Sequence, residues 1–136
     1  MTITICGSMK FAKEMLEMQK KLEELGHNVY IPKDSDLFLD DDSQKHDVDF
    51  MVKGDYIQNH FDKIASSEAI LVLNYDKNGI KNYIGGNTLM EIGVAKHLKK
   101  KIYFLNEVPT DEKISYLSEL KVVEKIVLSG DLSKIK

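Results

Sequence analysis

The sequence predicts a single-domain α/β protein whose doubly wound, five-stranded parallel sheet carries helices on both faces. A length of 136 residues suits one domain and is enough for a real core. Strand-like and helix-like segments alternate along the chain, which favours parallel strands joined by helical crossovers. Residues 69–74 and 101–106 are nearly continuous apolar runs, as in strands covered on both faces.

The strands are predicted from short β-branched or apolar runs that end in turn residues. They are expected at residues 2–6, 28–32, 69–74, 101–106 and 124–129. The helices are predicted from apolar residues three and four positions apart, at residues 9–25, 50–66, 88–99 and 111–120. Gly26 is a candidate C-cap of the first helix. Residues 34–49 form an irregular acidic stretch of a length typical of binding loops.

The composition excludes several classes of partner. The apolar share of 43% and the charged share of 30% are ordinary for a soluble protein. A net charge of -3 and a pI of about 5.8 give no basic field to attract nucleic acid or an anionic membrane. No apolar run reaches the roughly 20 residues that span a bilayer. Cys6 is the only cysteine, so an internal disulfide is impossible and a cytoplasmic location is expected.

The spacing of potential ligands predicts no metal site. The four histidines form no close pair. Cys6 has no partner motif and is interpreted as a buried strand residue. The acidic loop lacks the central glycine and the closing glutamate of an EF-hand, so a solvated loop is favoured over a calcium site. No metal and no other cofactor is therefore expected.

The turn after the first strand is a candidate ligand site, because doubly wound sheets bind ligands beyond the carboxyl ends of their strands. Gly7 and Ser8 precede a helix, where backbone N–H groups and the helix dipole favour an anion. Lys10 would add a positive charge. The alternative is that Ser8 is a helix cap and Gly7 permits the turn. The spacing matches neither a P-loop nor G-x-G-x-x-G, which disfavours ATP and dinucleotides.

Glu91 is a carboxylate within an apolar helical run that follows two glycines. Thr88 and Glu91 have the spacing of a capping box, in which Glu91 only caps the helix. A functional role is the alternative, because a carboxylate in the first turn of a helix is kept ionised by the dipole. The pattern of residues alone favours the cap.

The two motifs together resemble the nucleoside 2-deoxyribosyltransferase-like superfamily. This group includes nucleoside 2-deoxyribosyltransferases, 2′-deoxynucleoside 5′-phosphate N-hydrolases and pyrimidine nucleoside monophosphate N-ribosidases. The resemblance covers about residues 2–105 and rests on the Gly7–Ser8 turn and, downstream, on Gly86, Glu91, Gly93 and Ala95. It implies a flavodoxin-like strand order, 2-1-3-4-5, which agrees with the alternation of elements.

The resemblance also implies roles for individual residues. Glu91 corresponds to the family's nucleophile, and Gly7 and Ser8 to the turn that holds a 5′-phosphate. Lys10 stands where the phosphohydrolase branch has an arginine, and His60 where related enzymes have an aspartate that contacts the substrate.

Several further residues are candidates for contacts with the substrate. Asn74, Asp76, Asn87 and His60 are candidates to assist the leaving base, and Gly86 to line the site. Tyr83 or Phe38 could stack on the base, although packing explains both equally well. The resemblance also implies a homodimer in which residues 116–123, with Ser118 as the contact, complete the partner's site.

The sequence therefore supports two functions of different classes. The first is an enzyme that cleaves an N-glycosidic bond or transfers deoxyribose, and the second is a nucleotide-binding module without catalysis. The presence of Glu91 favours the enzyme, whereas His60 in place of an acid favours the binding module. The substrate is a small nucleoside or nucleotide in both cases. The sequence leaves open which base and which sugar are recognised, whether a phosphate is required, and whether the reaction is hydrolysis or transfer. NAD is a further possible substrate.

Overall fold

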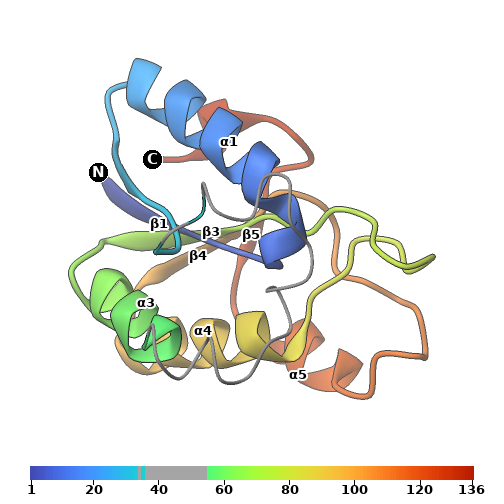
Figure 1. The fold of residues 1–136 in the computed structure, drawn as a ribbon. Helices are drawn as coiled ribbons and strands as arrows, with labels where there is room; N and C mark the ends of the chain where they lie inside the picture. The colour runs from blue at the N-terminus through green and yellow to red at the C-terminus, as the bar shows by residue number, and fades with distance from the viewer. Residues whose placement is uncertain (34, 36–54) are drawn as a thin grey trace.

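The computed structural model describes residues 1–33, 35 and 55–136. Within these residues five strands form one parallel sheet in the order β2-β1-β3-β4-β5, so the predicted fold class and strand order are confirmed (Figure 1). The strands are β1 (Thr2–Cys6), β2 (Asn28–Tyr30), β3 (Ala69–Val72), β4 (Lys101–Phe104) and β5 (Ile126–Val127). Apart from Ser35, the acidic stretch, including Phe38, lies outside the described residues.

The helices are η1 (Met9–Phe11), α1 (Ala12–Glu24), α3 (Tyr56–Ala65), α4 (Gly86–His97), α5 (Leu117–Val122) and η3 (Leu132–Lys134). Gly26 ends α1 as predicted: it has a φ of 94°, and the N–H of His27 donates to Leu22 at 3.1 Å, as in a Schellman motif. The helix predicted at residues 111–120 is wrong in its first half. The Asp111 carboxylate accepts from the backbone N–H of Lys113 at 2.9 Å, and this local turn competes with a helix.

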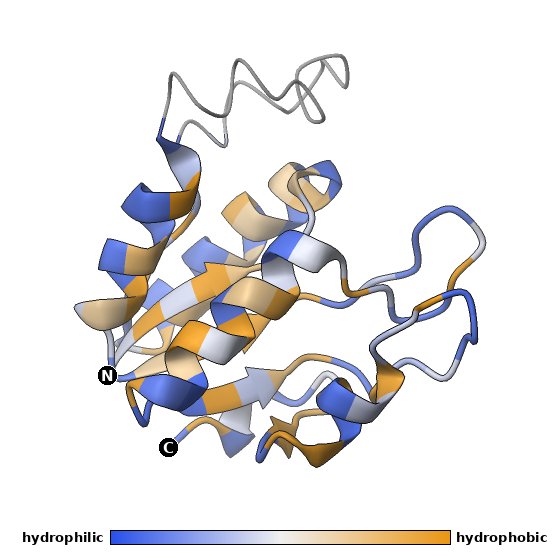
Figure 2. Ribbon diagram, turned by 90° about the horizontal axis from the view of Figure 1, so that it is seen from below, coloured by the Kyte–Doolittle hydropathy of each residue, from blue (hydrophilic) through white to orange (hydrophobic). Residues whose placement is uncertain are grey.

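Helices cover both faces of the sheet, with α1 on one face and α3, α4 and α5 on the other (Figure 1). Side chains alternate along a strand, so Ile3 and Ile5 join the core under α1, whereas Cys6 joins the core under α3 and α4. The strands are largely apolar, and the helices carry both apolar and polar residues (Figure 2). Cys6 thereby faces the same side of the sheet as α4. Among the residues described, no helix has the length and apolar character needed to cross a membrane.

Candidate functional site

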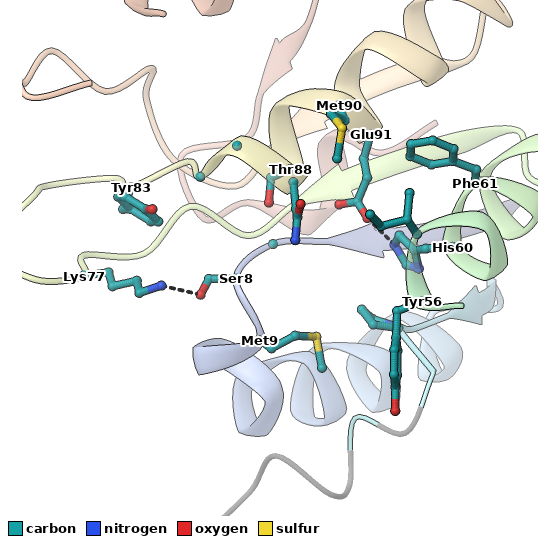
Figure 3. A pocket seen from close by; sticks show the side chains of 16 residues that line it. Ser8, Met9, Tyr56, His60, Phe61, Lys77, Tyr83, Thr88, Met90 and Glu91 are labelled. Carbon is teal, nitrogen blue, oxygen red and sulfur yellow. Dashed lines mark hydrogen bonds and ion pairs between the residues drawn. The ribbon is translucent and has the colours of Figure 1, made fainter. Parts of the chain in front are cut away.

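A cavity of about 360 Å³ lies beyond the carboxyl end of β1 (Figure 3). Five described segments contribute to its lining: the turn after β1, Pro32 after β2, α3, the loop that follows β3, and the first turns of α4. Its place at the ends of parallel strands is the one expected for a doubly wound sheet. Seven residues predicted to form or to be candidates for the site line it: Gly7, Ser8, His60, Tyr83, Gly86, Asn87 and Glu91.

The turn after β1 passes very close to the backbone just after β3. A Cβ atom on Gly7 would lie 3.0 Å from the backbone oxygen of Leu73, so only glycine fits without a shift of the backbone. Ser8 is the N-cap of η1, and its Oγ accepts from the backbone N–H of Lys10 at 3.3 Å. The interpretation of Ser8 as a cap is thus confirmed. The side chain of Lys10 is exposed and does not line the cavity, so the structure does not support its prediction as a binding residue.

A different lysine, Lys77, reaches this turn. The Lys77 N–H donates a hydrogen bond to the Ile80 oxygen at 3.0 Å, and the Ile80 N–H donates to the Lys77 oxygen at 2.9 Å. The two residues between them, Asn78 and Gly79, have φ values of 52° and 76°, as a tight type I′ turn requires. The Lys77 Nζ donates to the Ser8 Oγ at 2.9 Å and lies 4.9 Å from the centre of the Tyr83 ring. The Asn-Gly pair could have predicted the turn, but no local pattern predicts that Lys77 meets Ser8.

Glu91 is not a helix cap. The N-cap of α4 is Gly85, and this fully described helix has no acidic residue in its first turn. The N–H of Leu89 already donates to the Gly85 oxygen at 2.9 Å, so the helix begins before Thr88 and Glu91 falls in the second turn. The predicted capping box is therefore wrong. The Glu91 side chain is 14% exposed and lines the cavity, close to His60 (Figure 3).

Burial controls the charge of Glu91. It raises the Glu91 pKa to about 8, and a hydrogen bond with the Cys6 thiol opposes part of this shift. The expectation that the helix start keeps Glu91 ionised is therefore wrong, because the dipole acts mainly within the first turn. The carboxyl group is mostly protonated at pH 7 when the cavity is empty.

His60 is held neutral beside this carboxyl group. Burial, with a smaller contribution from the charge of Lys63, lowers the His60 pKa to about 4. Its Nε2 atom lies 3.5 Å from the Glu91 Oε2. The Glu91 pKa is raised and the His60 pKa is lowered, so both groups are mostly neutral at pH 7. Their contact is therefore not an ion pair. The correspondence of His60 to the aspartate of related enzymes stays a prediction.

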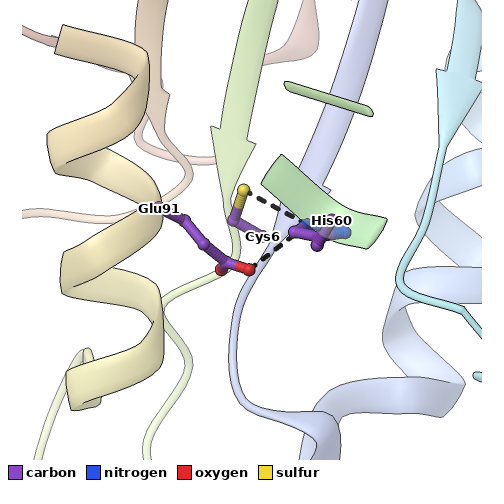
Figure 4. Close-up of side chains that lie close together, drawn as sticks. All are labelled: Cys6, His60 and Glu91. Atoms are coloured by element: carbon purple, nitrogen blue, oxygen red, sulfur yellow. Dashed lines mark hydrogen bonds and ion pairs between the residues drawn. The ribbon is translucent and has the colours of Figure 1, made fainter. Parts of the chain in front are cut away.

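Cys6, which the sequence predicts to be only a buried strand residue, belongs to the same cluster. Its thiol sulfur lies 3.6 Å from the His60 Nε2 (Figure 4). Burial and then the charge of Glu91 raise the pKa of the Cys6 thiol well above its usual value. The ligand atoms of Cys6, His60 and Glu91 lie within 4.8 Å of one another, a set that could hold a metal ion. Spacing along the sequence could not reveal this set, because β1, α3 and α4 each contribute one residue.

Asn74 has a structural role instead of the predicted substrate contact. It is fully buried and does not line the cavity. Its Nδ2 donates to the backbone oxygens of Asn106 and Glu107 at 3.0 and 2.9 Å. Its Oδ1 accepts from the N–H of Asn106 at 2.9 Å. The side chain thus joins the segments that follow β3 and β4, beyond the last backbone hydrogen bonds between these two strands.

We expect Asn74→Ala to destabilise the fold by about 3 kcal/mol, because buried backbone groups lose their partners. Urea denaturation measures this change. Asn28→Ala, at an exposed position of β2, is the control and should change the free energy of unfolding by less than about 0.5 kcal/mol. Equal stabilities for the two variants would show that the Asn74 hydrogen bonds contribute nothing.

The other predicted residues lie around the cavity or on the surface. Tyr83 lines the cavity. Asp76 accepts from the backbone N–H of Asn82 at 3.0 Å, so it stabilises the loop. Ser118 is exposed on α5 and does not line the cavity of its own chain. Its contact with a partner stays a prediction. Tyr116 donates its hydroxyl to the Ile84 oxygen at 2.7 Å, which ties the segment before α5 to the loop before α4.

Solved structures that are similar to this chain include the following three. The 2-deoxyribosyltransferase of Bacillus psychrosaccharolyticus is 19% identical over 76% of this chain and 71% of its own, with a TM-score of 0.48. The CMP N-glycosidase BcmB of Clostridium botulinum is 20% identical over 93% and 88%, with a TM-score of 0.50. A conserved protein from Enterococcus faecalis V583 is 16% identical over 92% and 77%, with a TM-score of 0.48.

At the level of sequence, no protein-family model and no curated protein matches the chain. The similarity in structure extends over most of the chain and of the CMP N-glycosidase. At 20% identity such a similarity establishes the fold and leaves the activity open. The chain therefore has the fold of the CMP N-glycosidase, as its resemblance to the nucleoside 2-deoxyribosyltransferase-like superfamily implies.

Proposed function

We propose that this protein cleaves the N-glycosidic bond of a nucleoside or nucleoside 5′-monophosphate, or transfers its sugar, with Glu91 as the nucleophile. The observation that carries the proposal is the position of the Glu91 carboxyl group in the cavity that also contains the Ser8–Lys77 pair. A cavity of about 360 Å³ lies within the usual range for small-molecule sites. The similarity to a CMP N-glycosidase supports the same chemistry.

The reaction follows from the chemistry of a carboxylate beside a sugar. Cleavage passes through an oxocarbenium-like state, which is positive at C1′. The ionised Glu91 carboxylate bonds to C1′ while the C1′–N bond breaks, and the electron pair leaves with the base. Water or a second base then attacks C1′ and releases Glu91. Asn87 and Tyr83, which also line the cavity, are the groups we expect to contact the base, by hydrogen bonding and by stacking.

Base release from a panel of substrates tests the proposal. The panel contains ribo- and deoxyribonucleosides, their 5′-monophosphates and NAD, and chromatography measures the free base. Release from a nucleoside or its monophosphate, with or without transfer to an added second base, supports the proposal. If no compound in the panel releases its base at any pH from 5 to 9, the proposal is wrong.

A nucleotide-binding module is the second candidate, and the charge state of the cluster favours it. Glu91 and His60 are both mostly neutral at pH 7 because of their shifted pKa values. A protonated carboxyl group does not attack C1′, yet it can donate a hydrogen bond to a ligand. Calorimetry separates the two functions: a binding module binds a member of the panel without releasing its base.

Lys77 is the residue we expect to distinguish monophosphates from nucleosides. It already donates to Ser8 on the Gly7–Ser8 turn, and a cation there attracts a 5′-phosphate. We expect Lys77→Met to lower kcat/KM at least about tenfold for a monophosphate, and less than about threefold for the matching nucleoside.

Lys10→Met is the matched control, because the Lys10 side chain is exposed and away from the cavity. It should leave both kcat/KM values within about twofold. Equal losses on nucleoside and monophosphate in Lys77→Met would contradict recognition of a phosphate by this lysine.

A homodimer is the assembly we expect, with residues 116–123 of one chain beside the cavity of the other. Two exposed apolar side chains lie on or close to this segment: Val122 is 81% and Ile126 46% exposed. Burial of such side chains favours association. Light scattering at micromolar concentration should give the mass of a dimer, and Val122→Asp should give a monomer. A monomeric wild type at that concentration would rule out this assembly.

A further inference from the structure

Cys6, His60 and Glu91 bring three metal-ligand atoms together from β1, α3 and α4 (Figure 4). One nitrogen is common to two of the contacts: the His60 Nε2 lies 3.6 Å from the Cys6 sulfur and 3.5 Å from the Glu91 Oε2. A thiol, an imidazole and a carboxyl group are the three ligand types that zinc uses in proteins.

These distances match the edges of a zinc tetrahedron. Bonds of about 2.3 Å to sulfur, 2.0 Å to nitrogen and 2.1 Å to oxygen place sulfur and nitrogen about 3.5 Å apart, and nitrogen and oxygen about 3.3 Å apart. The observed separations are 3.6 and 3.5 Å. The third pair, sulfur and carboxylate oxygen, lies within 4.8 Å, and a bound ion would bring it to about 3.6 Å.

The cluster is closed on one side and open on the other. Cys6 is fully buried, whereas His60 and Glu91 line the cavity. A metal ion can therefore enter from the cavity and keep a fourth position that faces it, as in zinc sites with three protein ligands. A thiolate and a carboxylate also balance the two charges of the ion, which a buried charge requires.

We infer that Cys6, His60 and Glu91 form a binding site for a single Zn²⁺-type dication, with the fourth position open to the cavity. The soft thiolate selects zinc-like ions over Mg²⁺ and Ca²⁺. Binding releases the thiol and carboxyl protons to solvent. Because the ion would occupy the Glu91 carboxylate, metal binding and attack by Glu91 on a sugar would exclude each other. The site itself rests on the ligands alone, so it stands whether or not the protein cleaves nucleosides.

Titration of the metal-free full chain with Co²⁺ tests this inference. Co²⁺ adopts the same tetrahedral sites and absorbs light, with a charge-transfer band when a thiolate is a ligand. Cys6 is the only cysteine, so such a band reports on this residue. We expect one equivalent of Co²⁺ to bind with this band and with the intense visible bands of a tetrahedral site, and one equivalent of Zn²⁺ to remove them.

The variants separate this site from adventitious binding. Cys6→Ser should lose the charge-transfer band, and His60→Gln and Glu91→Gln should each lower the affinity at least tenfold. His97→Gln, an exposed histidine on α4, is the matched control and should bind as the wild type does. Circular dichroism checks that each variant is folded. If Cys6→Ser does not fold, the affinity of His60→Gln for Co²⁺ tests the site in its place. Absence of the band in the wild type, or unchanged affinity in His60→Gln, would overturn the inference.

Discussion

Glu91→Gln is expected to lose at least about a thousandfold in kcat for release of the base, while the protein stays folded. A neutral amide neither bonds to C1′ nor balances the positive charge that develops there. The substitution keeps the size of the side chain, so the cavity should keep its shape. A residue that acts only in the transition state lowers kcat and kcat/KM together, and we expect that pattern for the best substrate of the panel.

The control for this variant is Glu24→Gln, at the exposed end of α1, which should retain the activity of the wild type. Both variants are compared with the wild type in metal-free buffer by base release and by melting curves. Wild-type turnover in a folded Glu91→Gln protein would show that another group performs the chemistry.

Glu91→Gln is also expected to stabilise the protein increasingly as the pH rises from 4.5 to 8. The folded pKa of Glu91 is about 8, whereas the usual value is 4.5. Between these values the unfolded chain loses its proton and the folded chain retains it, so the stability of the wild type falls as the pH rises. Glutamine has no proton to lose. The variant should therefore match the wild type near pH 4.5 and exceed it by about 3 kcal/mol at pH 7.

Urea denaturation of both proteins at four or five pH values, with a chelator present, measures this difference. His60 titrates in both proteins, so its lowered pKa largely cancels in the comparison. The same ionisation predicts that kcat/KM of the wild type rises with pH and levels off above about 8. A constant difference in stability across this pH range would mean that the Glu91 pKa is not raised.

The architecture could be predicted because its causes are local. Apolar runs such as residues 69–74 mark strands that are buried on both faces, and Gly26 ends α1 through its own backbone conformation. Alternation of such segments is enough to predict a parallel sheet. The strand order required the resemblance as well, because periodicity does not say which strands are neighbours.

The details of the site could be predicted only in part, because they depend on contacts between distant segments. The role expected of Glu91 comes from the resemblance, but its raised pKa arises from burial in the tertiary fold. Lys77, and not Lys10, reaches Ser8 because a tight turn directs the loop after β3 back over the cavity. Asn74 looks like a ligand contact at the end of a strand, yet its hydrogen bonds go to the backbone after β4. Each of these facts depends on the tertiary fold.

Covalent trapping tests the central claim most directly. A 2′-fluoro analogue of the best substrate slows both steps of a retaining reaction and can leave the sugar on the nucleophile. After incubation of the metal-free wild type, mass spectrometry of the intact protein and of its peptides locates the label. We expect one equivalent of base to be released and the mass of one fluorosugar to appear on Glu91. Release of base with Glu91 unlabelled, or a label on any other residue, would contradict the assignment of Glu91 as the nucleophile.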